Sequence, residues 1–308
     1  MYYFYEPRQQ EKCEPCKYPS SLASGSSSLA SHIRDSYSSI QAVSQAICEA
    51  GMMRARLVLG IDLTASNEWQ GRNTFNCHSL HRLHPVRSGQ GGRAGTDLTV
   101  NLRPASVYNP YQKVINIIGK TLQPFTDLNT IYGYGFGDRE TQDRSVFNIT
   151  LEAGEGEGGA CRDFKDLLDK YNETVRRVVL SGPTSFAPII RRAMRHVVES
   201  NNIFHILVII ADGQMEDEAA TVSAIVEASK LPLSIVLVGV GDGPWEVMEQ
   251  FDDHIRGREF DNFQFVDFHS IREARNPEAA FALAALMEVP LQYQAMVDLG
   301  YFDDNLSS

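Results

Sequence analysis

The sequence predicts an α/β fold in which a doubly wound, mostly parallel central sheet is flanked by helices on both faces. Short apolar, β-branched runs alternate along the chain with segments whose apolar residues recur at helical spacing, a pattern typical of parallel sheets. The runs at 54–62 and 204–211 show little polar–apolar alternation, as expected for strands covered on both faces. Each run leads directly to an aspartate, Asp62 or Asp212.

The first predicted element is a helix before the first strand, because Ile40, Val43 and Ile47 recur at helical spacing and Gly51 is a typical stop signal. After the strand at 54–62, short apolar runs between helical segments predict strands at residues 130–138, 204–211, 233–240 and 262–268. Apolar residues at helical spacing predict helices at residues 109–124, 163–176, 186–200, 217–230, 245–251 and 277–289.

Composition divides the chain into a predicted domain at 34–300 and two terminal segments. Residues 1–33 are rich in proline and serine, which favours a flexible arm, and residues 301–308 form a short tail. The stretch at about 82–104 is rich in glycine and arginine and has no periodicity, so we expect an inserted surface loop. Its arginines suggest a role in steering acidic partners on a protein that is otherwise acidic.

The charge and composition exclude several classes of function. The 308 residues carry a net charge of −11, which argues against a general nucleic-acid binder because phosphate contacts need clustered cations. Five cysteines are too few for a disulfide scaffold and fit a reducing compartment. The apolar runs are well short of the roughly 20 residues that span a bilayer, and the N-terminus lacks a signal-peptide pattern. We therefore expect a cytoplasmic protein, in one alternative associated with the cytoskeleton, with no integral membrane contact.

Oxygen-bearing side chains follow two of the predicted strands. Asp62, Thr64 and Ser66 occupy alternate positions after the first, and Asp212 follows the strand at 204–211. Thr184 lies on a further loop, Ser-Gly-Pro-Thr, that opens a helix. Because doubly wound sheets place their sites at the carboxyl ends of strands, these oxygens predict a site for a hard cation, Mg²⁺ or Mn²⁺. The alternative is that the hydroxyls are only helix caps and turn residues.

These patterns resemble the metal-ion-dependent adhesion site (MIDAS) of von Willebrand factor A domains. More narrowly, several long blocks of the sequence resemble the copine family and occur in the same order. They are LVLGIDLTASNEWQGRNTF, GPTSFAPII, HILVIIADGQ and LPLSIVLVGVGDGPW. The blocks look most similar to the A domain of plant copine-like RING ubiquitin ligases. The resemblance implies a magnesium-type site, completed by a carboxylate of a bound partner, with the metal ligands Asp62, Thr64, Ser66, Thr184 and Asp212.

The sequence also departs from these families. Cys13 and Cys16 form one C-x-x-C pair with no second pair, so we expect no RING and no ubiquitin ligase activity of the chain's own. Residues 1–33 are shorter than either of the two lipid-binding domains of copines, so we do not expect calcium-driven recruitment to membranes. Cys77, His78, His81 and His84 could suggest a transition-metal cluster, but ordinary exposed polar positions are the expectation.

Together these observations predict a metal-dependent protein–protein interaction module without catalytic activity, which binds an acidic partner protein. One alternative is a structural component of a larger cytoskeletal or axonemal assembly, with the aromatic N-terminal arm contacting partners and the metal site incidental. A second alternative is a substrate-presenting subunit of a ubiquitin ligase complex.

Overall fold

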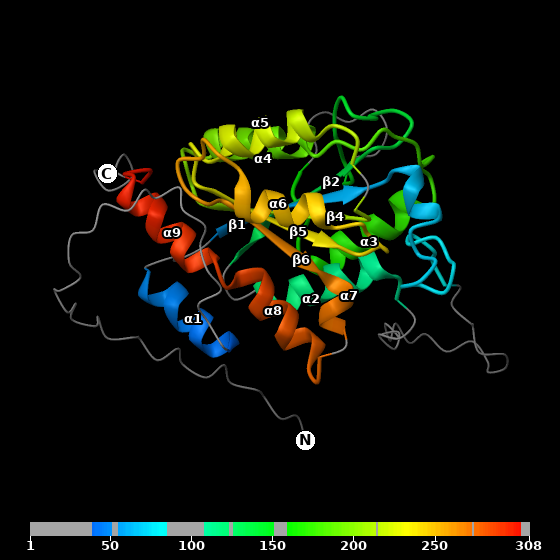
Figure 1. Cartoon of the computed structure of the whole chain (residues 1–308), viewed down its shortest axis with the longest axis horizontal. Helices are drawn as coiled ribbons and strands as arrows, with labels where there is room; N and C mark the ends of the chain where they lie inside the picture. Colours follow the sequence, from blue (N-terminus) through cyan, green and yellow to red (C-terminus); the bar gives the residue numbers. More distant parts are fainter. Residues whose placement is uncertain are drawn as a thin grey trace, which may run out of the picture.

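The computed structural model describes residues 39–50, 55–84, 108–122, 126–150, 159–213, 215–272 and 274–302. Its centre is a six-stranded sheet in the order β3-β2-β1-β4-β5-β6 (Figure 1). All neighbouring strands are parallel except β2 and β3, which are antiparallel. The strands are β1 Ala55–Asp62, β2 Thr126–Phe136, β3 Phe147–Asn148, β4 His205–Ala211, β5 Leu233–Gly239 and β6 Phe263–Asp267.

Strand order reverses between β1 and β4. The chain runs from β1 to one side, to β2, and later returns to the other side of β1 as β4. Ligands of open α/β sheets bind at this kind of switch point, beyond the carboxyl ends of the strands. Asp62 is the last residue of β1 and Asp212 follows the last residue of β4, so both aspartates lie at the switch point.

Helices cover both faces of the sheet (Figure 1). The helices α4, α5 and α6 pack on one face, and α1, α2, α3, α8 and α9 contribute to the core on the other. The helices are α1 Ile40–Glu49, the 3-10 helix η1 Ala65–Glu68, α2 Pro110–Leu122, α3 Phe164–Val175, α4 Ala187–Glu199, α5 Glu218–Ala228, α6 Glu246–His254, α7 Phe268–Arg272, α8 Pro277–Leu286 and α9 Val289–Asp298.

The predicted doubly wound fold is confirmed, and the differences lie in short or polar elements. The pattern did not predict β3, which is only two residues long, or η1, α7 and α9. It also placed the start of β2 at residue 130, because the preceding Thr-Asp-Leu-Asn is polar, whereas the strand begins at Thr126. The arm at 1–33 and nearly all of the loop at 82–104 lie outside the described residues.

Close approach between β1 and α4 depends on a glycine in the strand. A Cβ atom at Gly60 would lie 2.7 Å from Cγ1 of Ile189. Ile189 is fully buried in the core between the sheet and α4. The glycine therefore lets α4 pack directly on the central strand.

Among the described residues, the segment Pro277–Asp298 is long and apolar enough to cross a membrane by length and composition. However, 56% of its most apolar stretch is buried inside the protein, and it comprises two helices, α8 and α9, that pack on the sheet. Core helices commonly have this composition. The expectation of no membrane contact stays a prediction.

Candidate metal centre

The loop after β1 gathers three of the predicted ligands. The backbone N–H and the hydroxyl of Thr64 both donate to Asp62 Oδ1, at 2.9 and 2.7 Å. The Thr64 hydroxyl also lies 2.9 Å from the Ser66 hydroxyl. All three side chains are buried. The alternation of side chains after the strand end therefore brings three oxygens together, as the sequence predicted.

The turn after β4 brings in the second carboxylate. The backbone N–H of Asp212 points to Asp62 Oδ2 at 3.5 Å, and the Asp212 side chain is fully buried. The chain then turns at Gly213, whose φ of +99° lies in the region that favours glycine. The indole of Trp245 lies against this glycine, since a Cβ there would be 2.5 Å from the ring. Asp212 is thus held beside Asp62 by the pairing of β1 with β4, which precedes it, and by the tight turn at Gly213, which follows it.

Thr184 lies on the adjacent loop. Ser181 pairs with Thr64 as an isolated parallel bridge, and the Ser181 carbonyl accepts from Ala65 N. Thr184 is buried, and its backbone N–H donates to the carboxylate of Glu216. Its hydroxyl makes no hydrogen bond to the other four predicted ligands within the described part of the chain. The structure therefore joins Asp62, Thr64 and Ser66 by hydrogen bonds, brings the backbone of Asp212 to Asp62, and places Thr184 on the neighbouring loop.

Burial gives the centre an unusual carboxyl group. It raises the pKa of Asp62 from 3.8 to about 6, although hydrogen bonds from Thr64 act in the opposite direction. Two buried carboxyl groups at one point are costly when both are ionised, and a bound cation offsets that cost. The donors are two carboxylates and three hydroxyls, a set of oxygens that fits a hard divalent cation. No cluster of three or more His, Cys, Asp or Glu side chains suited to a metal occurs among the residues described.

A layer of buried polar side chains lies beneath the metal loop, and sequence analysis did not find it. The amide of Asn67 donates to the Thr64 carbonyl at 3.1 Å and accepts from the Tyr111 hydroxyl at 2.7 Å. His81 Nε2 lies 2.8 Å from the Asp62 carbonyl, and its Nδ1 lies 2.9 Å from the Tyr171 hydroxyl. These contacts link the metal loop to α2 and α3. Their partners are far apart in sequence, so no spacing pattern could show them.

The expectation that His81 is exposed is wrong. His81 is only 3% exposed, and its ring stacks on Tyr111 with centroids 4.1 Å apart. Burial lowers the pKa of His81 to about 4, so the ring is neutral near pH 7. Cys77 is exposed as expected, and His78 and His84 are partly exposed. His81 therefore positions the Asp62 backbone instead of belonging to a cluster with these residues.

The rim of the centre carries an exposed aromatic side chain. Trp69, at the end of η1, is 45% exposed. The other tryptophan, Trp245, packs against Gly213, Gly239 and the ring of Phe265. Trp69 is therefore accessible to a partner that approaches the metal loop, whereas Trp245 is mainly a packing residue.

Comparisons with known proteins agree with the blocks of sequence that surround this centre. The family model described as Copine matches residues 101–305. The E3 ubiquitin-protein ligases RGLG1 and RGLG3 of Arabidopsis thaliana are each 46% identical over 285 residues. Each alignment covers 87% of this chain, and it covers 53% of RGLG1 and 71% of RGLG3. Copine family protein 1 of Caenorhabditis elegans is 43% identical over 272 residues, which cover 87% of this chain and 22% of that protein.

The chain spans about half the length of RGLG1 and RGLG2. Among solved structures, manganese-loaded TRAP protein of Plasmodium vivax has a TM-score of 0.43 and 14% identity, with 74% of each chain covered. A von Willebrand factor type A protein of Catenulispora acidiphila has a TM-score of 0.40 and 14% identity, with 78% of this chain and 43% of that chain covered. These structural likenesses are too low to inform function. The family match and the sequence identities show that the chain belongs to the copine family.

Proposed function

We propose that this chain is a non-catalytic protein-interaction module that binds an acidic partner protein through a divalent cation, Mg²⁺ or Mn²⁺. The observation that carries the proposal is the buried contact between the loop after β1 and the turn after β4, where Asp212 N approaches Asp62 Oδ2 at the switch point. The Thr64 and Ser66 hydroxyls extend this contact into a continuous set of oxygens. Membership of the copine family supports a role in protein interaction.

The cation would be held by the side chains of Asp62, Thr64, Ser66, Thr184 and Asp212. When bound, it would supply an electrophilic centre for one further anionic oxygen, because two aspartates neutralise only its own charge. Asp62 is held in register by Thr64 and, through its carbonyl, by His81. The buried surroundings exclude water and strengthen an electrostatic contact at this point.

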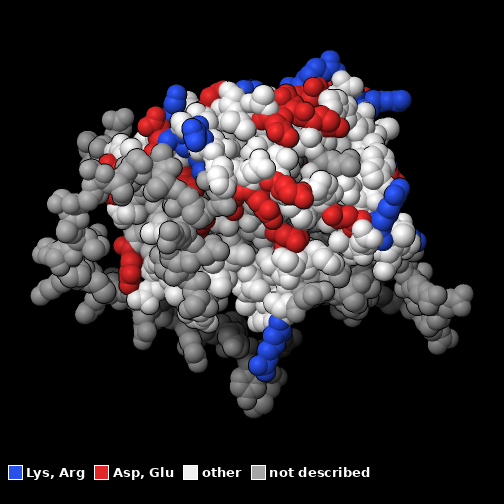
Figure 2. All heavy atoms as spheres, in the orientation of Figure 1, with Lys and Arg blue, Asp and Glu red and all other residues white. Residues whose placement is uncertain are grey.

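The negative charge of the surface supports binding of an acidic partner at a single point, the bound cation. The chain has a net charge of −11, and acidic side chains gather on the face over α6 (Figure 2). Such a surface repels an acidic partner in general, so a carboxylate is attracted only where a local cation reverses the potential. Trp69 at the rim would add apolar contact next to the metal. The same proposal places the module in the cytoplasm.

Calorimetric titration of metal-stripped protein with MgCl₂ tests the metal site. We expect saturable binding in the wild type and none in Asp62→Asn. Asp267→Asn is the matched control, because Asp267 also ends a parallel strand and caps a following helix through His269 N, outside the candidate centre. Binding that survives in Asp62→Asn, or is lost equally in the control, would contradict the assignment.

A second candidate function follows from the relatives. RGLG1 and RGLG3 are named E3 ubiquitin-protein ligases, so this chain is also a candidate for presenting substrates to a ubiquitin ligase. Reconstituted ubiquitination with a separate RING protein tests it. The candidate predicts that adding this chain increases modification of a bound protein, and that Asp62→Asn removes the increase. No effect of the wild-type chain would contradict it.

A further inference from the structure

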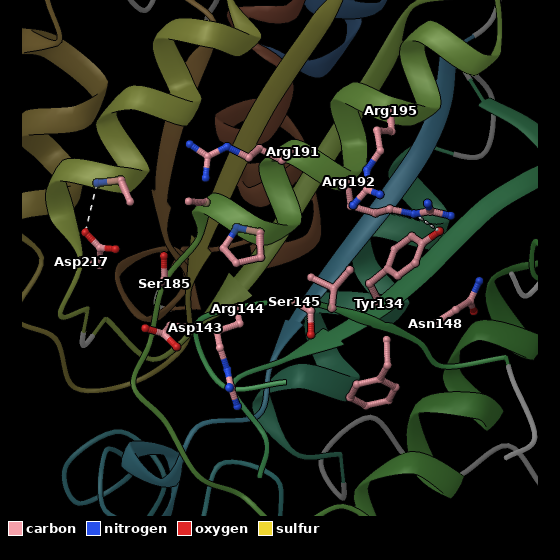
Figure 3. A pocket seen from close by; sticks show the side chains of 15 residues that line it. Tyr134, Asp143, Arg144, Ser145, Asn148, Ser185, Arg191, Arg192, Arg195 and Asp217 are labelled. Carbon is pink, nitrogen blue, oxygen red and sulfur yellow. Dashed lines mark hydrogen bonds between the residues drawn. The ribbon is translucent and has the colours of Figure 1, made fainter. Parts of the chain in front are cut away.

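A pocket of about 750 Å³ lies beside the candidate metal centre but shares none of its predicted ligands. One wall is the start of α4, and the opposite wall is the segment from Asp143 to Asn148 that contains β3 (Figure 3). The ring of Tyr134, on β2, lies between them, and Ser185 and Asp217 form the edge nearest the metal loops. This volume falls within the range of about 300–1,000 Å³ that is usual for small-molecule sites.

Four arginines line this pocket and approach it from both walls. Arg191, Arg192 and Arg195 lie on one face of α4, and Arg144 comes from the opposite segment (Figure 3). Guanidinium groups present paired N–H donors that match phosphate oxygens. In Figure 3 the Arg144 side chain extends away from α4, so it has to turn toward the pocket before a ligand could contact guanidinium groups from both walls.

One arginine is fixed in place and two are available at the surface. Arg192 Nε donates to the Tyr134 hydroxyl at 2.9 Å, and its guanidinium lies 5.2 Å from the centroid of that ring. Arg195 is exposed and forms no ion pair with any described residue, while Arg144 donates to the neutral Gln142 side chain at 2.7 Å. Arg191 is 3.4 Å from Glu227 in an exposed ion pair. Arg195 and Arg144 can therefore turn toward a ligand without breaking an ion pair to a described acid.

Acidic groups in the lining reduce the positive charge but do not cancel it. The lining contains Asp143 and Asp217 against the four arginines. Asp217 accepts from Ala220 N at 3.1 Å and caps α5, which fixes its position but leaves its negative charge in the lining. A concave positive site thus occurs on a chain whose net charge is −11.

We propose that this pocket binds a small ligand with two or more phosphate groups on a compact carbon framework, of the sugar-phosphate or inositol-polyphosphate class. The number of arginines in the lining, three on α4 and Arg144 on the facing segment, favours several phosphates over one. Val146 and Pro188 in the lining offer apolar surface for the carbon framework between the phosphates. A flat anionic membrane fits less well, because a concave site of about 750 Å³ encloses a small ligand better than it meets a flat surface. The site does not depend on the proposed metal-dependent function.

Calorimetric titration of the whole chain with myo-inositol hexakisphosphate, in EDTA to remove divalent cations, tests the proposal. We expect saturable binding at about 0.15 M salt, weakened about tenfold or more in the double variant Arg144→Gln/Arg195→Gln. The matched control is Arg176→Gln/Arg256→Gln, which removes the same charge from two exposed arginines outside the pocket. We expect the control to retain affinity within about twofold.

Three results would overturn the proposal: no saturable binding by the wild type, no effect of the pocket variant, or an equal loss in the control. A parallel titration with vesicles that contain a bisphosphorylated inositol lipid distinguishes the two sources of the same chemistry. Binding of the free polyphosphate without the vesicles supports a soluble ligand. Binding of both the free polyphosphate and the vesicles, each weakened by the pocket variant, supports a lipid headgroup as the ligand. Asp62→Asn should bind the polyphosphate like the wild type, so failure of the metal site and failure of this pocket are distinguishable.

Discussion

Replacing Asp62 with asparagine is expected to stabilise the metal-free protein and to remove its response to magnesium. Burial raises the pKa of the Asp62 carboxyl from 3.8 to about 6. A carboxyl whose pKa is higher in the folded state favours folding at low pH, where it is protonated, and this contribution is lost as the pH rises through about 6. At neutral pH the wild type therefore folds with a costly buried charge, which asparagine does not carry.

The size of the effect follows from the two pKa values. At about 1.4 kcal/mol per pH unit between 3.8 and about 6, ionised Asp62 lowers the free energy of unfolding by about 3 kcal/mol above pH 7. Asparagine can still accept from Thr64 N, but its amide faces the N–H of Asp212, which lies 3.5 Å from Asp62 Oδ2 in the wild type. Allowing for this poorer contact, we expect a net gain of about 2 kcal/mol.

Urea unfolding in EDTA, followed by circular dichroism, measures this gain. We expect the unfolding free energy of Asp62→Asn to exceed that of the wild type by about 2 kcal/mol at about pH 7.5, and the difference to shrink to about a third of that at about pH 5. Adding MgCl₂ should stabilise only the wild type, because binding to the folded state adds to its stability. A variant that is no more stable in EDTA, or that gains as much from magnesium as the wild type, would refute the reasoning.

Three further predictions concern the rest of the fold. Burial lowers the pKa of His205 from 6.5 to about 4, so the unfolded state takes up a proton more readily and the protein loses stability as the pH falls. Between about pH 7 and pH 5, the unfolding free energy of His205→Gln should therefore fall by about 2 kcal/mol less than that of the wild type, and equal losses would contradict this. Gly60→Ala should lower the unfolding free energy by about 1–3 kcal/mol, because the new methyl would meet Ile189 at 2.7 Å; an unchanged melting temperature would count against it. Asp242 accepts from Asn73 N, Thr74 N and the Thr74 hydroxyl, so Asp242→Ala should expose residues 70–77 to proteolysis at unchanged helix content, and an unaltered digestion pattern would oppose it.

The sheet and most helices could be predicted from the sequence because their signals are local. Apolar runs such as 204–211 and the periodicity of residues 109–124 place a strand and a helix without knowledge of the rest of the chain. The contact between Asp62 and Asp212 was also predictable, because parallel strands end at the same edge of a sheet. What no local pattern contains is the two-residue strand β3, which is held by its pairing with β2.

The supporting residues of the two candidate sites could not be predicted for the same reason. His81 and Tyr171 are 90 residues apart, and their hydrogen bond exists only because α3 packs beside the metal loop. The arginines of α4 are visible in the sequence, but Arg144, about 50 residues earlier, becomes their neighbour only through the pairing of β2 and β3. The sequence therefore predicted a role only for the arginines of the loop at 82–104, whereas the structure shows a second arginine group on α4.

The hydroxyl of Tyr171 also contacts the two residues that flank the long segment 82–108, namely His81 and Asn109. It lies 2.9 Å from His81 Nδ1 and 3.1 Å from Asn109 Nδ2, so His81 and Asn109 are held at one point. Since the entropy of closing a loop rises slowly with its length, such an anchor tolerates change in the length of what lies between. We therefore expect the segment to accept an inserted fluorescent tag or binding domain that leaves the sheet and both candidate sites intact.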